Sequence, residues 1–277
     1  PLEPPIGRSK RPETSRQAYG IEAANEFDPV FEDVNDWCEV QEIDIDTLAH
    51  EAGAAQMEIN FNHGDPLELA DQAFLFKRTL RQAALKHDIY ATFMAKPLES
   101  EPGSSMHIHQ SVYSVETGDN LFAKEDGTYS DLFLHHIAGL QRFMPAAMPL
   151  LAPNVNSYRR LRRYSDAPIN VQWGWENRTV GLRVPESDRQ SRRVENRVAL
   201  GLGRLAVEIG ERQRPDPQGG KLRAGAAQGA LLHRLVSTSF RSTSATARAT
   251  ACSIDMVEVS ILTASSAGLS GASARPA

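Results

Sequence analysis

The feature that most limits the possible folds is a set of short segments in which polar residues occupy every second position. In Gln56–Phe61 the order is QMEINF, so Glu58 belongs to the polar set. The segment Met106–Val112 repeats this design, with His107 and His109 on its polar side. Because successive side chains of a strand point to opposite sides, both segments are predicted to be strands with one apolar and one polar face.

The polar faces allow two interpretations. Glu51 is followed by small residues at positions 52–55, and a tight reversal there would bring Glu51 and Glu58 face to face. Adjacent carboxylates raise each other's pKa, and a divalent cation between them would remove that cost. A solvent-facing polar side of a half-buried strand explains the same residues, and a surface histidine pair explains His107 and His109.

Two longer segments have helical patterns. Asp65 can cap a helix whose first position is Pro66, and this helix is predicted to run to about His87. Residues at helical spacing, expected on one side of it, are Leu67, Ala70, Phe74, Lys77 and Leu80-Arg81. Apolar residues at helical spacing predict a second helix from about Ser130 to Met148. Further strands are predicted at Ile89–Ala95, Ile169–Trp173 and Val180–Val184.

Changes in residue composition along the chain predict three regions. Residues 1–20 are polar, contain four prolines and are expected to form a loop or tail. Residues 21–198 alternate strands and helices. Residues 199–277 change in character, and from position 237 onward they are rich in Ser, Ala and Thr with Phe240 as the one aromatic residue. Such a stretch buries too little apolar area to offset chain ordering, so we expect a poorly ordered tail.

Composition excludes several classes of protein. No run approaches the roughly 18 consecutive apolar residues of a membrane span. The two cysteines, Cys38 and Cys252, cannot build a disulfide framework, which favours a reducing cytoplasm. The net charge is −5, and the acidic balance before residue 200 argues against nucleic acid as the main partner. Ordinary solubility charge explains that balance equally well.

A third group of segments is dense in arginine. The arginines are Arg159, Arg160, Arg162, Arg163, Arg178, Arg183, Arg192, Arg193 and Arg197. In the last segment Arg193, Glu195 and Arg197 fall on one face of a strand. Guanidinium groups bind phosphate and carboxylate through paired hydrogen bonds, so this set indicates a site for metal-bound polyphosphate beside a carboxylate substrate. A nucleic-acid surface is the alternative, which the lack of clustered lysines weakens.

Five of these segments, taken in order, resemble successive motifs of the glutamine synthetase family. They are Glu51 with Gln56–Glu58, Lys96-Pro97 with Gly103–Ser111, Asn156–Arg160, Asn177-Arg178 with Arg183–Pro185, and Arg193–Arg197. Each motif is weak alone, whereas five in order over about residues 20–198 are specific. The resemblance implies an α+β catalytic domain over residues 21–198, with a mostly antiparallel sheet backed by helices and truncated at both ends.

The resemblance also implies a metal and substrate site. One Mg²⁺ or Mn²⁺ would be held by Glu51 and Glu58, and a second by His107 and Glu195. The residues that would position the glutamate substrate are Gly103, Arg160 and Arg197. Those that would line the nucleotide or its phosphates are His109, Ser111, Arg183 and Arg193, with Arg178 as a catalytic residue at the transferred phosphoryl group. ATP would phosphorylate the glutamate side chain, and an amine would then displace phosphate.

Two features depart from the family pattern. The paired-glutamate strand that supplies one further ligand to each metal has no counterpart here. The small N-terminal domain, which completes a neighbouring subunit's site in the ring-shaped homo-oligomer, has none either. After Arg197 the match stops abruptly, and we expect residues 199–277 to be the product of a shifted reading frame.

The acceptor amine also looks different from ammonia. Where ammonia-using members have a glutamate near the entering nucleophile, this chain has Asp166, which we assign as catalytic. In Val171–Arg178, Pro102–Val112 and the opening Gly7-Arg8-Ser9, the chain is most similar to the branch that ligates glutamate to putrescine or other polyamines. Trp173 and Trp175 could contact an alkyl-ammonium group, or could be core residues. An ammonia-using glutamine synthetase and a non-catalytic remnant are the alternative functions.

Overall fold

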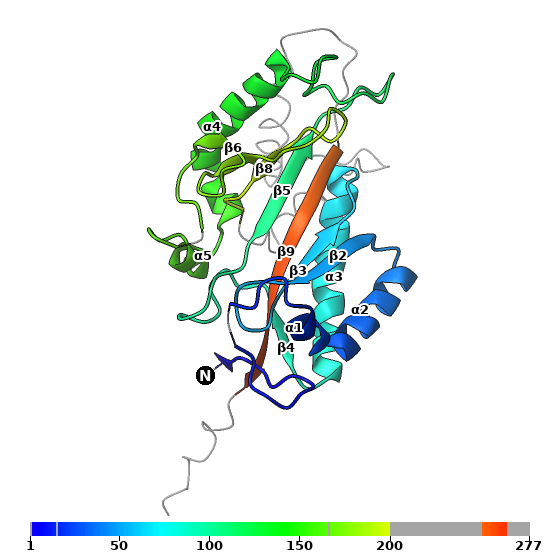
Figure 1. Cartoon of the computed structure of the whole chain (residues 1–277), viewed down its shortest axis with the longest axis vertical. Helices are drawn as coiled ribbons and strands as arrows, with labels where there is room; N and C mark the ends of the chain where they lie inside the picture. The colour runs from blue at the N-terminus through cyan, green and yellow to red at the C-terminus, as the bar shows by residue number, and fades with distance from the viewer. Residues whose placement is uncertain (1, 15, 166, 200–250, 265–277) are drawn as a thin grey trace, which may run out of the picture.

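The centre of the molecule is one mostly antiparallel sheet, in a computed structural model that describes residues 2–14, 16–165, 167–199 and 251–264. Its main path runs β2-β3-β9-β5-β8-β7-β6, and β1 and β4 also pair with β9 (Figure 1). The strands are β1 (Leu2–Glu3), β2 (Ile45–His50), β3 (Gln56–Phe61), β4 (Tyr90–Thr92), β5 (Met106–Ser111), β6 (Trp173–Trp175), β7 (Leu182–Val184), β8 (Val194–Asn196) and β9 (Ala251–Ala264). Among these described strands, only β6 and β7 pair in parallel. The predicted α+β class is confirmed.

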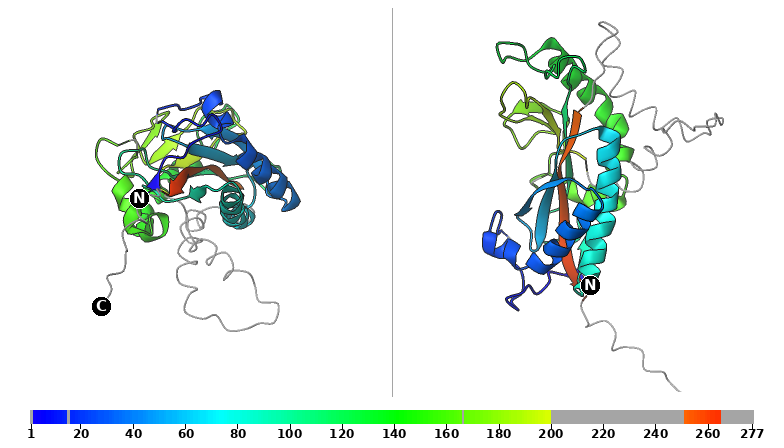
Figure 2. Two further views of the ribbon diagram at one scale, coloured as in Figure 1. Left: turned by 90° about the horizontal axis from the view of Figure 1, so that it is seen from below. Right: turned by 90° about the vertical axis from the view of Figure 1, so that its right-hand side faces the viewer.

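The helices cover the sheet rather than extend it. They are α1 (Ile21–Asn25), α2 (Asp28–Val40), α3 (Pro66–Lys86), α4 (Asp131–Leu151) and α5 (Val155–Arg160). The two long helices, α3 and α4, lie on the same side of the sheet (Figure 2). Among the described helices, none combines the length and apolar character needed to cross a membrane.

The two long helices begin where their capping residues predict. The Asp65 carboxylate accepts the backbone N–H groups of Leu67 and Glu68 at 2.9 and 3.4 Å. The Ser130 hydroxyl accepts the N–H of Phe133 at 3.1 Å. Since these bonds satisfy N–H groups that have no partner inside the helix, both predicted starts are confirmed.

The buried side of α3 differs from the one that its apolar spacing suggested. Phe74 was expected on that side, but it is 42% exposed, whereas Phe76 is fully buried. The Phe76 ring meets Phe61 of β3 edge to face, with 5.1 Å between ring centroids. This contact sets the rotation of the helix on the sheet, which spacing along one helix cannot reveal.

The core has two parts that share the sheet. One packs α2 and α3 against β3, around Met57 and Phe76. The other packs α4 against β7 and β8, around Leu182 and Val194. Ile108 of β5 is partly buried against both. The polar residues that alternate with these apolar ones therefore lie on the other side of the sheet.

The predicted reversal between Glu51 and Gln56 is a hairpin. Strands β2 and β3 pair antiparallel, with Ala49 opposite Glu58 and His50 opposite Met57. One residue after β2, the backbone N–H of Glu51 donates to the carbonyl of Gln56 at the start of β3, at 2.7 Å. Glu51 thus lies just past the end of β2, two positions after Ala49, which is opposite Glu58.

The expectation of a poorly ordered tail is wrong for Ala251–Ala264, which form strand β9 at the middle of the sheet. The signal was present in the sequence, because Val257, Val259 and Ile261 alternate with Glu258 and Ser260. The Ser, Ala and Thr content of the whole tail concealed it. The remainder of 199–277, apart from Ala199 itself, lies outside the described residues.

The segment expected to be a loop or tail at 1–20 is irregular but is held against the hairpin. The Glu13 carboxylate lies 3.3 Å from Nε2 of the buried His50 and accepts the Ala55 N–H at 3.3 Å. The N–H of Tyr19 donates to the carbonyl of His50 at 2.6 Å. These contacts of Glu13 and Tyr19 hold the segment against the hairpin.

Other elements shifted or were not predicted. The strand expected at Ile169–Trp173 is instead Trp173–Trp175, and the other two predicted strands are shorter than expected. Strand β8 was seen only as a residue pattern, and helix α2 and strand β2 were not predicted. These elements are short or mixed in pattern, and neighbouring elements supply the packing that stabilises them.

Burial of His136 predicts acid sensitivity. His136 of α4 packs against Phe122, and burial lowers its pKa from 6.5 to about 4. The unfolded chain therefore takes up this proton first as pH falls, so stability present above pH 6.5 is lost towards pH 4. The loss from this group is roughly 3 kcal/mol. Urea unfolding at pH 7.5 and 4.5 should show a smaller pH effect in His136→Asn than in the unchanged chain.

The matched control for this measurement is the adjacent, exposed His135. His135→Asn should keep the full pH effect. An equal pH effect in both variants would contradict the role of His136 burial.

Candidate functional site

Three charged or polar residues form a row across strands β7, β8 and β5. Glu195 lies opposite Arg183 in the β7–β8 pair and opposite His109 in the β5–β8 pair. Directly opposed residues of neighbouring strands point to the same side of the sheet, so the register alone brings these three together. Arg183 Nη1 donates to Glu195 Oε2 at 3.0 Å, and His109 Nε2 lies 3.7 Å from Oε1.

His107 and Arg197 approach the same carboxylate. Arg197, two positions after Glu195, donates from Nη1 to Oε1 at 2.7 Å. His107 places Nδ1 2.9 Å from Oε1, and its Nε2 lies 3.0 Å from the Ser105 hydroxyl. The prediction that Glu195 and Arg197 share a face is therefore confirmed, and both ring nitrogens of His107 have polar neighbours.

Arg193 adds a second layer on His109. Its Nε donates to His109 Nδ1 at 2.8 Å. His109 must accept at Nδ1, so the proton of a neutral ring sits on Nε2, which faces Glu195. Arg193 and Arg197, which flank β8, thus lie on both sides of its carboxylate.

The electrostatics of this cluster favour an ionised Glu195 beside a neutral His107. Burial raises the pKa of Glu195, but contacts with His107, His109 and Arg197 outweigh it and hold the pKa well below its ordinary range. Burial lowers the pKa of His107 to about 4, against the opposing influence of Glu195. Near neutral pH the pair therefore consists of a carboxylate anion and an uncharged imidazole.

Two predicted glutamate-binding residues are in contact. A Cβ atom added to Gly103 would lie 2.4 Å from the carbonyl oxygen of Ala95 and 2.8 Å from Cγ of Arg160. Only glycine leaves room for the Arg160 side chain to cross the backbone here. The buried Gln56 side chain donates to the Gly103 carbonyl at 3.1 Å and so ties this loop to β3.

Glu58 and His107 lie on the same side of the sheet. Glu58 is opposite Glu258 of β9, and His107 is opposite Met256, two positions before Glu258. Both Glu58 and His107 are buried. Strand β9 runs between them, so they belong to two regions of one surface.

The predicted metal ligands have suitable donor chemistry but form no closed metal site. Carboxylate oxygens and imidazole nitrogens suit Mg²⁺ or Mn²⁺. Within the part of the chain that the structure describes, however, no three His, Cys, Asp or Glu side chains gather as a metal-binding group. Arg183 and Arg197 already approach both oxygens of Glu195.

Two predicted site residues lie away from the Glu195 cluster, and a third lies outside the part of the chain that the structure describes. Arg178 is exposed, and its charge contributes to lowering the pKa of Glu176. Ser111 is the last residue of β5, beyond His109. Asp166 lies outside the described residues.

The interpretation of the two tryptophans as core residues is wrong, because Trp173 and Trp175 are 39% and 46% exposed. In the register of β6 with β7, Trp173 is opposite Leu182, and Gly174 is opposite Arg183. Since alternate residues face opposite sides, Trp173 lies on the side of the sheet away from Arg183. A contact of either tryptophan with an alkyl-ammonium group stays a prediction.

Sequence reasoning missed two polar partners of the site. Ser105, just before β5, was given no role, yet it is buried beside His107. Glu176 accepts from Arg183 Nη2 at 3.2 Å and so shares this arginine with Glu195. Position within a resembling motif was the only available signal for either residue.

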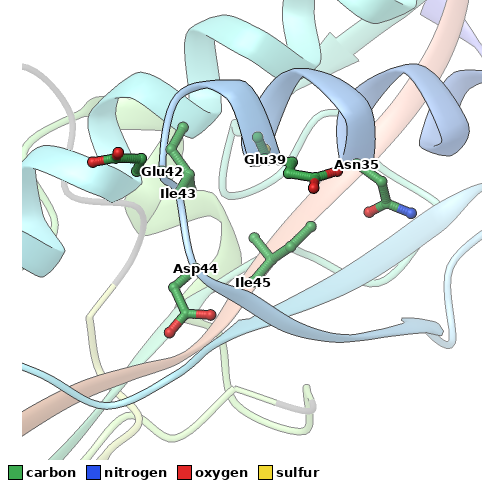
Figure 3. A pocket seen from close by; sticks show the side chains of 7 residues that line it. Asn35, Glu39, Glu42, Ile43, Asp44 and Ile45 are labelled. Atoms are coloured by element: carbon green, nitrogen blue, oxygen red, sulfur yellow. The ribbon is translucent and has the colours of Figure 1, made fainter.

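A separate pocket of about 370 Å³ lies between the end of α2 and the start of β2. It contains none of the predicted site residues; its lining is Asn35, Cys38, Glu39, Glu42, Ile43, Asp44 and Ile45. Figure 3 shows the three carboxylates of this lining directed different ways. They do not converge on a common point as metal ligands would.

Comparison with known proteins places residues 2–202 in the family described as glutamine synthetase, catalytic domain. The chain is 43% identical over 201 residues to gamma-glutamylputrescine synthetase PuuA of Escherichia coli (strain K12), covering 72% of this chain and 42% of the relative. It is 41% identical over 152 residues to a glutamine synthetase of Thermococcus kodakarensis, covering 55% and 34%. The chain thus spans less than half the length of these relatives.

Two solved structures also resemble this chain. The structure titled "GmaS/ADP complex-Conformation 1" matches with a TM-score of 0.59 at 26% identity, over 76% of this chain and 51% of the other. The structure titled "Apo GmaS without ligand" also matches with a TM-score of 0.59 at 26% identity.

Removing the charge of Glu195 should weaken the fold. Glu195→Gln keeps the size of the side chain but leaves Arg183, Arg197 and their buried surroundings without a neutralising carboxylate. We expect a loss of about 3–5 kcal/mol in the free energy of unfolding, measured with urea at pH 7.5. Glu176→Gln is the matched control, because Glu176 contacts the same arginine from an exposed position and should matter far less. Equal effects of the two substitutions would contradict a central role for Glu195.

Proposed function

The chain belongs to the glutamine synthetase family, whose members are ATP-dependent ligases, and on that premise we propose that it forms part of an enzyme that joins glutamate to an amine. The observation that carries the proposal is the buried Glu195 carboxylate with arginines from two strands around it. Such a set binds and releases anions by exchanging one ion pair for another. A phosphorylated carboxylate substrate has the matching charge.

The chemistry proceeds through an acyl phosphate. A carboxylate oxygen is a poor leaving group, so ATP first transfers its terminal phosphoryl group to the glutamate side chain, and the amine then displaces phosphate. We assign Arg183 and Arg178 to the phosphoryl oxygens and Arg193 to the nucleotide. Arg183 suits this role because it is only partly buried and already bridges two carboxylates. His109 and Ser111 would line the nucleotide beside it.

Glutamate would bind on the other side of Glu195. Arg160 crosses the backbone at Gly103, and Arg197, directly after β8, donates to Glu195. Two guanidinium groups beside the loop backbone at Gly103 can hold the carboxylates of an amino acid. Gly103 permits this close approach because any larger residue would displace Arg160.

The proposed site would hold two divalent cations. We propose that Glu51 and Glu58 contribute to one Mg²⁺ or Mn²⁺ position and His107 and Glu195 to the other. Each position then needs at least one further ligand. When bound, the cation supplies positive charge to the ATP phosphates.

The amine is proposed to be putrescine or another polyamine. The similarity to the Escherichia coli gamma-glutamylputrescine synthetase supports this choice over ammonia. Asp166 would attract the ammonium group and remove its proton before attack. We place the activity in the cytoplasm, in a ring-shaped homo-oligomer without a membrane or nucleic-acid partner.

Two other functions would explain part of the same observations. An ammonia-using glutamine synthetase is favoured by the similarity to the Thermococcus kodakarensis protein. A non-catalytic remnant is favoured by the incomplete metal-binding group within the described residues. Both alternatives predict a turnover that differs from that of a polyamine ligase.

The amine can be identified in a chimera. Residues 2–202 would replace the matching region of the Escherichia coli relative, which supplies the rest of the family length. With ATP, Mg²⁺ and glutamate, phosphate release should depend on putrescine and be much slower with ammonium. Activity with ammonium alone would overturn the polyamine assignment. The absence of ATP binding and turnover, in a chimera that folds, would favour the remnant.

Asp166 can be tested in the same chimera. Asp166→Asn removes the proposed base, so putrescine-dependent turnover should fall by about 10²–10⁴-fold. Binding of ATP and glutamate, measured by calorimetry, should change little. Asp126→Asn, an exposed loop carboxylate, is the matched control and should leave turnover unchanged. Full turnover in Asp166→Asn would remove this residue from the mechanism.

A further inference from the structure

Strand β9 joins two halves of the sheet that are otherwise separate among the described strands. On one side it pairs with β3, with Val257 opposite Ile59 and Glu258 opposite Glu58. On the other it pairs with β5, where Val257 is also opposite Met106. No other described strand links the β2–β3 pair to the four strands from β5 to β6.

The strand also anchors two outlying elements. Strand β4 pairs with Leu262–Ser260 through Tyr90–Thr92, and β1 pairs with the last residues of β9. Within the described residues, β9 is the strand partner of both. A single extended segment therefore supplies main-chain hydrogen bonds to four others.

This central strand lies outside the region that matches the family. The family match ends at residue 202, whereas β9 begins at Ala251. The matching region ends beside the strand position, since the Ala199 carbonyl accepts the Met106 N–H at 3.2 Å. Ala251 lies opposite Ser111, at the far end of β5 from Met106.

We propose that the space between β3 and β5 is a strand-acceptor site and that Ala251–Ala264 is the peptide that docks in it. The docking mode is strand addition, in which main-chain bonds provide affinity and alternate side chains provide register. Each edge strand of the site exposes unpaired N–H and C=O groups when the peptide is absent. The alternation of Val257, Val259 and Ile261 fits an acceptor with one apolar side.

Docking of this peptide assembles the candidate site. Glu51 and Glu58 belong to the β2–β3 half, and His107, Glu195 and Arg183 belong to the half that begins at β5. Contacts such as Gln56 with Gly103 link the halves at one end, but β9 fills the space along the strands. The proposal stands independently of which reaction the site performs.

Proline substitution in the full chain tests the docking. Val257→Pro removes one N–H and distorts a residue that is paired on both sides. Amides of β3 and β5 should then exchange with deuterium at least about 100-fold faster, as measured by mass spectrometry. Val257→Thr keeps the N–H and should retain protection, and Ser270→Pro, placed after the strand, should do the same.

A synthetic peptide with the sequence of residues 251–264 provides the second measurement. Added in excess to the Val257→Pro chain, it should restore protection in both β3 and β5, whereas a scrambled peptide should not. This holds whether the variant opens locally or unfolds, because the acceptor is formed from the rest of the chain. Unchanged exchange in Val257→Pro, or failure of the peptide to restore protection, would overturn the proposal.

Discussion

The buried carboxylate of Glu195 is the interaction on which the polar side of the sheet depends. A carboxylate with 1% exposure is costly unless cations and hydrogen bonds compensate it. Arg183 from β7, Arg197 from β8 and His107 from β5 provide that compensation. The same contacts draw three strands together at one level, so that fold stability and site geometry rest on one charge.

Alternate residues of each strand face opposite sides of the sheet, so the packing residues and the site residues lie on different sides. Residues such as Met57, Leu182 and Val194 face the helices, and the residues between them face the site. A one-residue slip in any strand would exchange these sides and bury charges against helices. Strand β9 lies between β3 and β5, so its pairing sets the register of these two strands relative to each other. The requirement for correct register therefore extends to a segment far along the chain.

The ion pairs that stabilise Glu195 also limit what can bind beside it. Under the proposed function, a phosphoryl group would have to compete with Glu176 and Glu195 for Arg183. A cation held by Glu195 would likewise have to compete with Arg183 and Arg197. Because polyphosphate and cation carry opposite charges, each would compensate the residues that the other displaces.

The helix starts and the polar faces of the strands follow from the residue types alone. Asp65 and Ser130 begin their helices because their side chains satisfy neighbouring N–H groups, and alternation places Glu58 and His107 on polar strand faces. The order of motifs also identified the family. Only the tertiary structure decided that Phe76 rather than Phe74 faces the sheet, that Trp173 lies away from Arg183, and that Val257 occupies the sheet centre. These depend on pairing between residues distant in sequence, where the burial gained in the whole fold outweighs local preference.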